Sequence, residues 1–199
     1  MARIITETNS NRKDIILKNA AALFRRNGFK SSSMRELADS LNIEAPSLYN
    51  HFRSKAELLR GICFSVAEDF TTHIVSVNAS TASSHEKVTG LISFHIKKMH
   101  SEFDNVYVSN HEWKHLQPED LEHFLSQRRQ YENVMTSIIT AGIKSKELRT
   151  QNPRVTVLTI LSAVRGLEFW QRHKKELSIK ELEQEMISLL IGGIINTAP

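Results

Sequence analysis

Residues 44–51 carry side chains that can hydrogen-bond to phosphates and to the edges of nucleic-acid bases. The positions left facing outward include an acid, a hydroxyl, a phenol, an amide and an imidazole: Glu44, Ala45, Ser47, Tyr49, Asn50 and His51. Such groups contact the backbone and the base edges of DNA. Leu48 and Phe52 lie four residues apart, so they would hold one face of this segment against a small core.

The surrounding residues 33–53 predict two short helices joined by a tight turn. Ser33 is an expected N-cap with Glu36 as its capping-box partner, and Asn42 stands where the turn needs a positive φ. Ile43 then fills the corner between the helices. This is the spacing of a helix-turn-helix, whose second helix enters the major groove of DNA. An ordinary helical hairpin with one solvated face is the alternative.

Residues from about 10 to 60 resemble the DNA-binding domain of TetR-type transcriptional regulators. The resemblance rests on Phe24, Gly28-Phe29, Ser32-Ser33-Met34, Ile43 to Leu48, Leu48-Tyr49-Asn50-His51-Phe52 and Ser54-Lys55. It implies that Tyr49, His51 and Lys55 bind DNA phosphates. It further implies that register or sequence is set by Ser33, Arg35, Glu44, Ala45, Ser47 and Asn50. Asn50 departs from the aromatic residue that is common there in the family.

Composition predicts an all-α protein. The chain has 199 residues, with only 7 glycines and 4 prolines among long helical patterns. Its single cysteine, Cys63, excludes an intramolecular disulfide, and no apolar run approaches the roughly 20 residues that span a bilayer. Together with the absence of a signal-peptide pattern at the start, this predicts a soluble, cytoplasmic protein without a membrane partner. Residues 1–60 hold 11 basic and 6 acidic side chains, an excess that suits DNA.

The helical patterns predict two domains. We expect a three-helix DNA-binding domain over 1–54, with a flexible arm at 1–10 and Asn11 capping the first helix. A long helix over about 55–77 would join it to a larger ligand-binding and dimerisation domain within 55–199. The polar stretch 76–84 would separate them and end in a capping box of Ser83 and Glu86.

The last two predicted helices begin at Pro153 and near Ser178. They are more apolar than one small core demands, so we expect them to pair with a second copy as a four-helix bundle. The alternative is that they only complete the core of one subunit. A dimer also suits DNA recognition, because two half-sites strengthen a weak single contact.

The resemblance implies that the C-terminal domain encloses a small-molecule effector that lowers DNA affinity. Candidate pocket residues are Phe94, His95, Met99, Phe103, Trp113, Phe124, Tyr131 and Trp170. Plain core packing is the alternative for most of them. Residues 111–135 are similar to a subgroup of these regulators that senses acyl-CoA thioesters. Such a ligand would need a basic entrance, for which Arg128, Arg129 and Arg172 are available.

Residues 111–115, HEWKH, match the zinc-protease pattern H-E-x-x-H. A metal-dependent hydrolase centred on His111, Glu112 and His115 is therefore the rival function. No further ligand motif follows, and Pro118 would break the helix directly after the pattern. A regulatory metal held with Glu119, Glu122 or His123 stays open as a further alternative. We expect a regulator without catalytic residues, resident metal or cofactor, whose effector, operator and sign of regulation the sequence does not specify.

Overall fold

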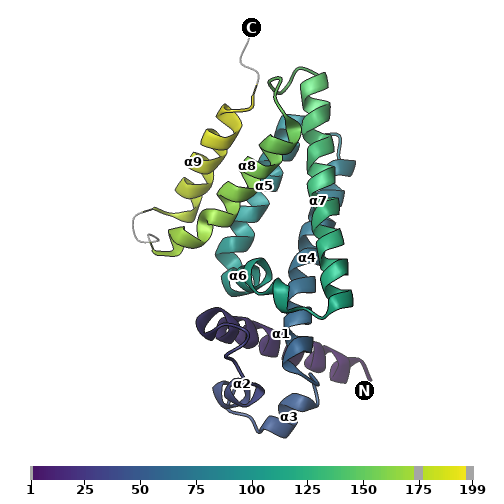
Figure 1. Ribbon diagram of the computed structural model, residues 1–199, viewed down its shortest axis with the longest axis vertical. Helices are drawn as coiled ribbons and strands as arrows, with labels where there is room; N and C mark the ends of the chain where they lie inside the picture. Colours follow the sequence, from purple (N-terminus) through teal and green to yellow (C-terminus); the bar gives the residue numbers. More distant parts are fainter. Residues whose placement is uncertain (1, 173–176, 196–199) are drawn as a thin grey trace. The chain divides into compact units, whose positions relative to one another are not determined.

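The computed structural model describes residues 2–172 and 177–195, with side chains described for 12–170 and 177–195 (Figure 1). Within these ranges the chain forms helices, turns and one isolated antiparallel β-bridge between Leu148 and Ile195. The predicted all-α class is confirmed. No helix in the described ranges is long and apolar enough to span a bilayer.

The helices follow one another along the chain with short connections. They are α1 (Ala2–Asn27), α2 (Met34–Ser40), α3 (Ala45–Tyr49), α4 (Lys55–Ala79), α5 (Ser84–Ser101), α6 (Phe103–His111), the 3₁₀ helix η1 (Trp113–His115), α7 (Pro118–Lys144), α8 (Pro153–Arg165), the 3₁₀ helix η2 (Gly166–Arg172) and α9 (Ile179–Gly192).

Most helix ends lie where local capping residues predict them. Ser83 and Ser178 each form a complete capping box with a glutamate three residues later, and the Asn152 side chain caps α8. Gly28 ends α1 with φ of 80°, a conformation that glycine adopts freely. The start of α1 is a correction: the helix begins at Ala2, so residues 2–10 are not an irregular arm and Asn11 lies inside the helix.

The chain divides into two compact units. The first contains residues up to 67 together with 104–125, and the second contains 68–103 together with everything from 126 onward. Helices α4 and α7 therefore contribute to both units. The division arises because Val108, Leu116 and Phe124 join the core of the N-terminal helices. The predicted boundary at residue 54 divides the chain by function and not by compactness, so it stays a prediction.

The core of the first unit joins the helix-turn-helix to its neighbours. Phe24 of α1, Leu37 of α2 and Leu48 of α3 are buried together with Leu58 and Leu59 of α4. Each short helix contributes few apolar side chains, so the long helices α1 and α4 supply most of the apolar surface on which α2 and α3 rest. Burying one leucine contributes about 1.5–3 kcal/mol, which makes each of these contacts matter for so small a motif.

The second unit is organised around α5, against which α8 and α9 both pack. The buried side of α5 carries Val88, Leu91, Ile92, Ile96 and Met99. This confirms that α5 lies centrally, as its broad apolar surface indicates.

A buried pair of polar side chains lies within this unit. His95 Nε2 and the Tyr131 hydroxyl are 3.0 Å apart, and the Phe70 ring packs against both residues. Burial, assisted by the positive charge of Arg165, lowers the pKa of His95 to about 3, and burial raises the pKa of Tyr131. The pair is therefore uncharged at neutral pH, which suits its apolar surroundings.

Stability should fall on mild acidification because of His95. The unfolded chain binds a proton at the ordinary histidine pKa of 6.5, whereas the folded chain does so only near pH 3. Between these values the unfolded state holds the extra proton, so the free energy of unfolding falls by up to about 1.4 kcal/mol per pH unit as pH decreases. Urea unfolding at pH 7.5, 6.0 and 5.0 should show a shallower dependence for His95→Gln than for the wild type.

The exposed residue His123 supplies the control for this experiment. His123→Gln replaces a histidine at the surface in the same way and should keep the wild-type slope. Equal slopes for His95→Gln and the wild type would contradict the assignment of acid sensitivity to His95.

Candidate DNA interface and ligand pocket

The helix-turn-helix is built by local hydrogen bonds between α2 and α3. The Ser33 hydroxyl accepts from the Glu36 amide at 3.2 Å, and the Glu36 carboxylate accepts from the Ser33 amide at 2.7 Å. Asn42 has φ of 53°, and the Ile43 amide donates to the Ala38 carbonyl at 3.1 Å. The capping box and the positive-φ turn are thus confirmed.

The α3 segment presents half of its six predicted DNA-contacting side chains to solvent. Leu48 is the buried anchor of α3, while Tyr49 remains 50% exposed. Glu44 and Asn50 are exposed as well. Ala45, Ser47 and His51 are partly buried. A short, polar helix held by one leucine is suited to insertion into a groove, because its contacts with the rest of the protein lie on one side.

The remaining predicted DNA contacts are Ser33, Arg35 and Lys55. Ser33 is exposed, but its hydroxyl is already engaged in the cap of α2. Arg35 is exposed on the first turn of α2. Lys55 is different, because its ammonium group lies within hydrogen-bonding distance of three backbone carbonyls of the loop between α1 and α2. Its role as a phosphate ligand stays a prediction.

The zinc-protease pattern does not form its site. Helix α6 ends at His111, so His111 and His115 are not one turn apart on a single helix. The His111 ring packs on Tyr107, whereas the His115 ring stacks on Phe29. The described part of the chain contains no cluster of three or more potential metal ligands. The geometry therefore gives the hydrolase alternative no support.

The eight predicted pocket residues do not lie in one place. Trp113 and Phe124 pack in the core of the first unit. The other six lie in the second unit, where Phe94 stacks on His73 with ring centroids 3.8 Å apart. Met99 and Tyr131 are largely buried, at 3% and 9% exposure. Among the described residues, the buried Nε1 of Trp170 and Nδ1 of His73 find no hydrogen-bond partner. The assignment of these six to an effector site stays a prediction.

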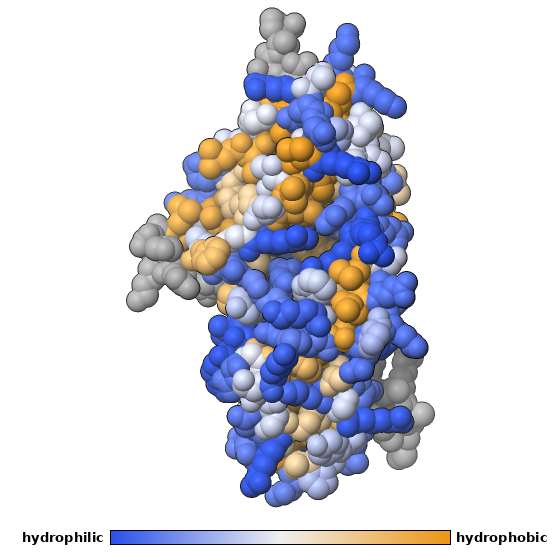
Figure 2. All heavy atoms as spheres, viewed as in Figure 1, coloured by the Kyte–Doolittle hydropathy of each residue, from blue (hydrophilic) through white to orange (hydrophobic). Residues whose placement is uncertain are grey.

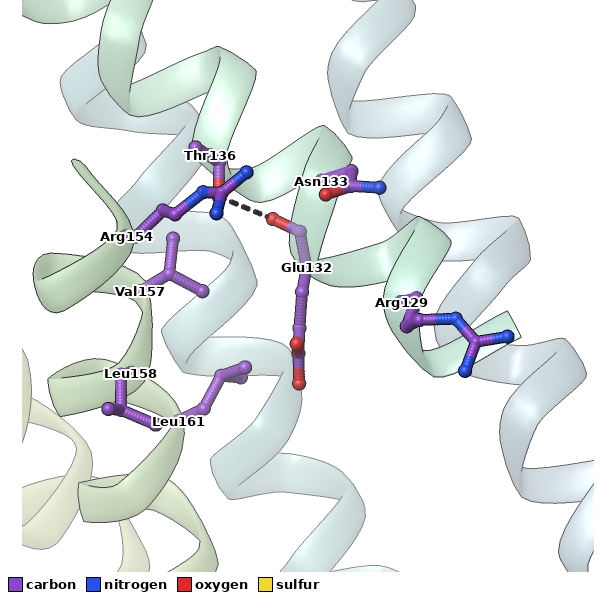
Figure 3. Close-up of a pocket in the computed structure, with 8 residues that line it drawn as sticks. All are labelled: Arg129, Glu132, Asn133, Thr136, Arg154, Val157, Leu158 and Leu161. Atoms are coloured by element: carbon purple, nitrogen blue, oxygen red, sulfur yellow. Dashed lines mark hydrogen bonds between the residues drawn. The ribbon is translucent and has the colours of Figure 1, made fainter. Parts of the chain in front are cut away.

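A pocket of about 340 Å³ opens between α7 and α8 in the second unit (Figure 3). Its lining residues come from two turns of each helix: Arg129, Glu132, Asn133 and Thr136 from α7, and Arg154, Val157, Leu158 and Leu161 from α8. This volume lies at the lower end of the range typical of small-molecule sites. None of the eight residues predicted for the pocket lines it.

The pocket combines an apolar wall with cationic side chains. Val157 and Leu161 are buried, while Arg129 and Arg154 are exposed. Figure 3 shows Arg154 reaching from α8 toward Thr136 of α7. Glu132 is the acidic lining residue, and its carboxylate lies 3.8 Å from the Arg165 guanidinium. The local balance is therefore positive, which favours a ligand that is partly apolar and carries negative charge.

Of the three arginines proposed for a basic entrance, Arg129 lines this pocket, whereas the Arg172 side chain lies outside the described residues. Arg154 was missed by the sequence reasoning. Its signal is weak, because an arginine in the first turn of an amphipathic helix usually belongs to a solvated face.

Comparisons with known proteins agree with this architecture. Residues 16–62 match the family model of bacterial regulatory proteins of the tetR family, and residues 81–194 match the tetracyclin repressor-like C-terminal domain. The HTH-type transcriptional repressor KstR2 of Mycobacterium tuberculosis is 24% identical over 199 residues, covering 98% of each chain.

Solved structures share the fold over most of the chain. The ketosteroid transcriptional regulator KstR2 of Mycobacterium tuberculosis superimposes with a TM-score of 0.86 at 22% identity, covering 92% of this chain and 95% of that one. AibR in complex with isovaleryl coenzyme A and operator DNA gives 0.80 at 21% identity, covering 90% and 98%.

The C-terminal match alone spans more than half of the chain, and the N-terminal match includes the whole helix-turn-helix. The chain therefore belongs to the TetR family of bacterial regulatory proteins and is a DNA-binding transcriptional regulator, not an enzyme.

Proposed function

We propose that this protein is a transcriptional repressor that binds a palindromic operator as a homodimer and releases it when a small molecule binds. The observation that carries the proposal is the set of exposed polar side chains at the two ends of α3, Glu44, Tyr49 and Asn50, on a helix-turn-helix that Leu48 anchors. The related protein KstR2 is described as a repressor, which favours that sign of regulation. Because such a protein acts on chromosomal DNA, we place it in the cytoplasm.

Exposed apolar side chains on the last helices support a homodimer. Leu158 of α8 is 64% exposed, and Leu189 of α9 is 75% exposed. Phe169 of η2 is exposed as well. Figure 2 shows apolar side chains gathered over α8 and α9 on this face of the molecule. A contiguous apolar surface of this kind typically marks a protein interface, and a second copy is the partner that the family fold favours.

The pocket between α7 and α8 is the proposed effector site. Its arginines and its apolar wall suit an amphiphilic anion, and an acyl-CoA thioester has both features. The complex of AibR with isovaleryl coenzyme A supports this class of ligand. Release follows if the effector binds more tightly to the conformation that fits the operator poorly, and a coupling of about 1–3 kcal/mol changes DNA affinity 5–150-fold.

Selection of bound duplexes from a random pool tests DNA recognition. The enriched sequences should form a palindrome with half-sites about one helical turn apart, because each subunit presents one α3. In Asn50→Ala the preference should weaken at one base position of each half-site by about 1–3 kcal/mol. Tyr49→Phe should instead weaken binding to all duplexes alike. Absence of any enriched sequence would contradict operator recognition.

Introducing charge on the exposed apolar surface should separate the subunits. The double variant Leu158→Asp with Leu189→Asp should sediment as a monomer of about half the wild-type mass, because a charge cannot be buried without a partner. Its operator affinity should fall with the loss of the second half-site contact. Val75→Asp, at another exposed apolar position, on α4, is the control and should remain dimeric. A dimeric double variant would place the interface elsewhere.

Loss of Arg154 should weaken effector binding. Titration calorimetry with short and medium-chain acyl-CoA thioesters should show an affinity about tenfold or more lower for Arg154→Ala, because a charge-assisted contact is removed. The corresponding free fatty acids should bind less well than the thioesters. Lys144→Ala removes a positive charge from the exposed end of α7 and should change little. Equal losses in both variants would indicate a general charge effect and contradict the site.

A further inference from the structure

The pocket between α7 and α8 carries an acidic side chain, that of Glu132. In Figure 3 this side chain extends from α7 into the space between the two helices. From α8 the pocket receives Val157, Leu158 and Leu161, whose side chains have no hydrogen-bonding groups. An acid in a pocket that otherwise favours anions weakens the binding of those anions, so its presence calls for a separate explanation.

The Glu132 carboxylate has room for a hydrogen-bond donor. A carboxylate offers about four positions for donors. The Arg165 guanidinium lies 3.8 Å from it, beyond hydrogen-bonding distance, and both side chains are partly exposed. The Thr136 hydroxyl, which also lines the pocket, donates to the backbone oxygen of Glu132 at 2.7 Å and not to the carboxylate. A ligand in the pocket can therefore donate to Glu132 without breaking a hydrogen bond of Thr136.

A ligand that enters this pocket displaces solvent from the Glu132 carboxylate. If the ligand presents only apolar groups or further acceptors there, the charged oxygens lose hydrogen bonds and binding is weakened. A ligand that presents a hydroxyl replaces the lost hydrogen bonds with one to a charged acceptor, which is stronger than a bond between neutral groups. The pocket should therefore discriminate between ligands of equal length by the presence of a donor.

The size of the pocket limits how much of a thioester can approach Glu132. A volume of about 340 Å³ suits the smaller drug-sized ligands, and a coenzyme A thioester is larger than these. Only one end of such a ligand can therefore enter. Because Val157 and Leu161 are buried whereas Arg129 and Arg154 are exposed, the acyl end fits inside and the phosphates fit outside.

We propose that Glu132 is a specificity-determining residue that selects a hydroxyacyl thioester by accepting a hydrogen bond from a hydroxyl on the acyl group. This rests on the proposed effector role of the pocket. A hydroxyl can donate to the carboxylate, an unsubstituted chain cannot, and a ketone offers only a further acceptor. The affinity of the pocket should therefore be highest for the hydroxyl and lowest for the ketone.

Titration calorimetry of the wild-type protein with four-carbon thioesters tests this order. The probes are butyryl-CoA, acetoacetyl-CoA and the 2-, 3- and 4-hydroxybutyryl thioesters of coenzyme A, which share one chain length and differ in one substituent. At least one hydroxybutyryl thioester should bind about tenfold more tightly than butyryl-CoA, and acetoacetyl-CoA should bind no more tightly than butyryl-CoA. Equal affinities for butyryl-CoA and all three hydroxybutyryl thioesters would overturn the proposal.

The variant Glu132→Gln separates this residue from the other polar groups of the pocket. The amide has nearly the same shape, carries no charge, and has an NH₂ group that can donate to a ketone. The preference for the hydroxybutyryl thioester over acetoacetyl-CoA should therefore fall about tenfold. Butyryl-CoA should bind at least as well as to the wild type, since no charged group then loses solvent.

Glu122→Gln is the matched control, because it removes the same charge from an exposed position of α7 that does not line the pocket. This variant should keep the wild-type preference. If Glu132→Gln also keeps it, the hydroxyl contacts another residue and the proposal is overturned. Equal losses of preference in both variants would likewise overturn it, since they would show an effect of overall charge.

The proposed effector class and the role of Glu132 can fail separately. Wild-type protein that binds all of these thioesters without preferring a hydroxyl would overturn the role of Glu132 and leave the effector class intact. Wild-type protein that binds none of them would refute the effector class and the role of Glu132 together.

Discussion

The constraint on which this molecule depends is that a helix of five residues must stay rigid while the side that carries Pro46 and Tyr49 faces solvent. Isolated helices shorter than about 12–15 residues are marginal in water, so α3 cannot hold its own shape. Leu48 is its fully buried anchor. The position and rigidity of α3 therefore depend on what lies beneath it, namely the apolar surface of α1 and α4. The long helices α1 and α4 therefore hold the short helix α3 in position.

Local features of the fold could be predicted from sequence because their partners lie within a few residues. The Ser33–Glu36 capping box and the positive φ of Asn42 need no information beyond four or five neighbours. The partners of Lys55 lie 23 to 26 residues away, and nothing in the residue types 29–32 distinguishes an inward-pointing carbonyl from a solvated one. The resemblance to the family implies that Lys55 also contacts DNA phosphate, and that role stays a prediction.

The aromatic residues predicted for one pocket lie in two different units, because sequence spacing carries no information about distant partners. Phe94, Phe124 and Trp113 share helical spacing and apolar character, yet Phe124 and Trp113 belong to the first unit. Sequence periodicity identifies which face of a helix is buried but not which core it enters. The pocket between α7 and α8 was missed because its polar lining looks like a solvated helix face. Only the packing of two helices converts Thr136 and Arg154 from surface residues into opposite walls.

Helix α7 carries residues of the proposed effector pocket and also residues of the core that supports the helix-turn-helix. Its later turns carry Arg129, Glu132 and Thr136 of the pocket. Its first turns carry Asp120, which pairs with Arg60 of α4 at 2.9 Å, and Phe124, which is buried in the core that supports the helix-turn-helix. In the proposed function, effector control requires only that the effector and the operator favour different conformations of the protein, and a helix that contributes to both units is one element whose conformation both could affect.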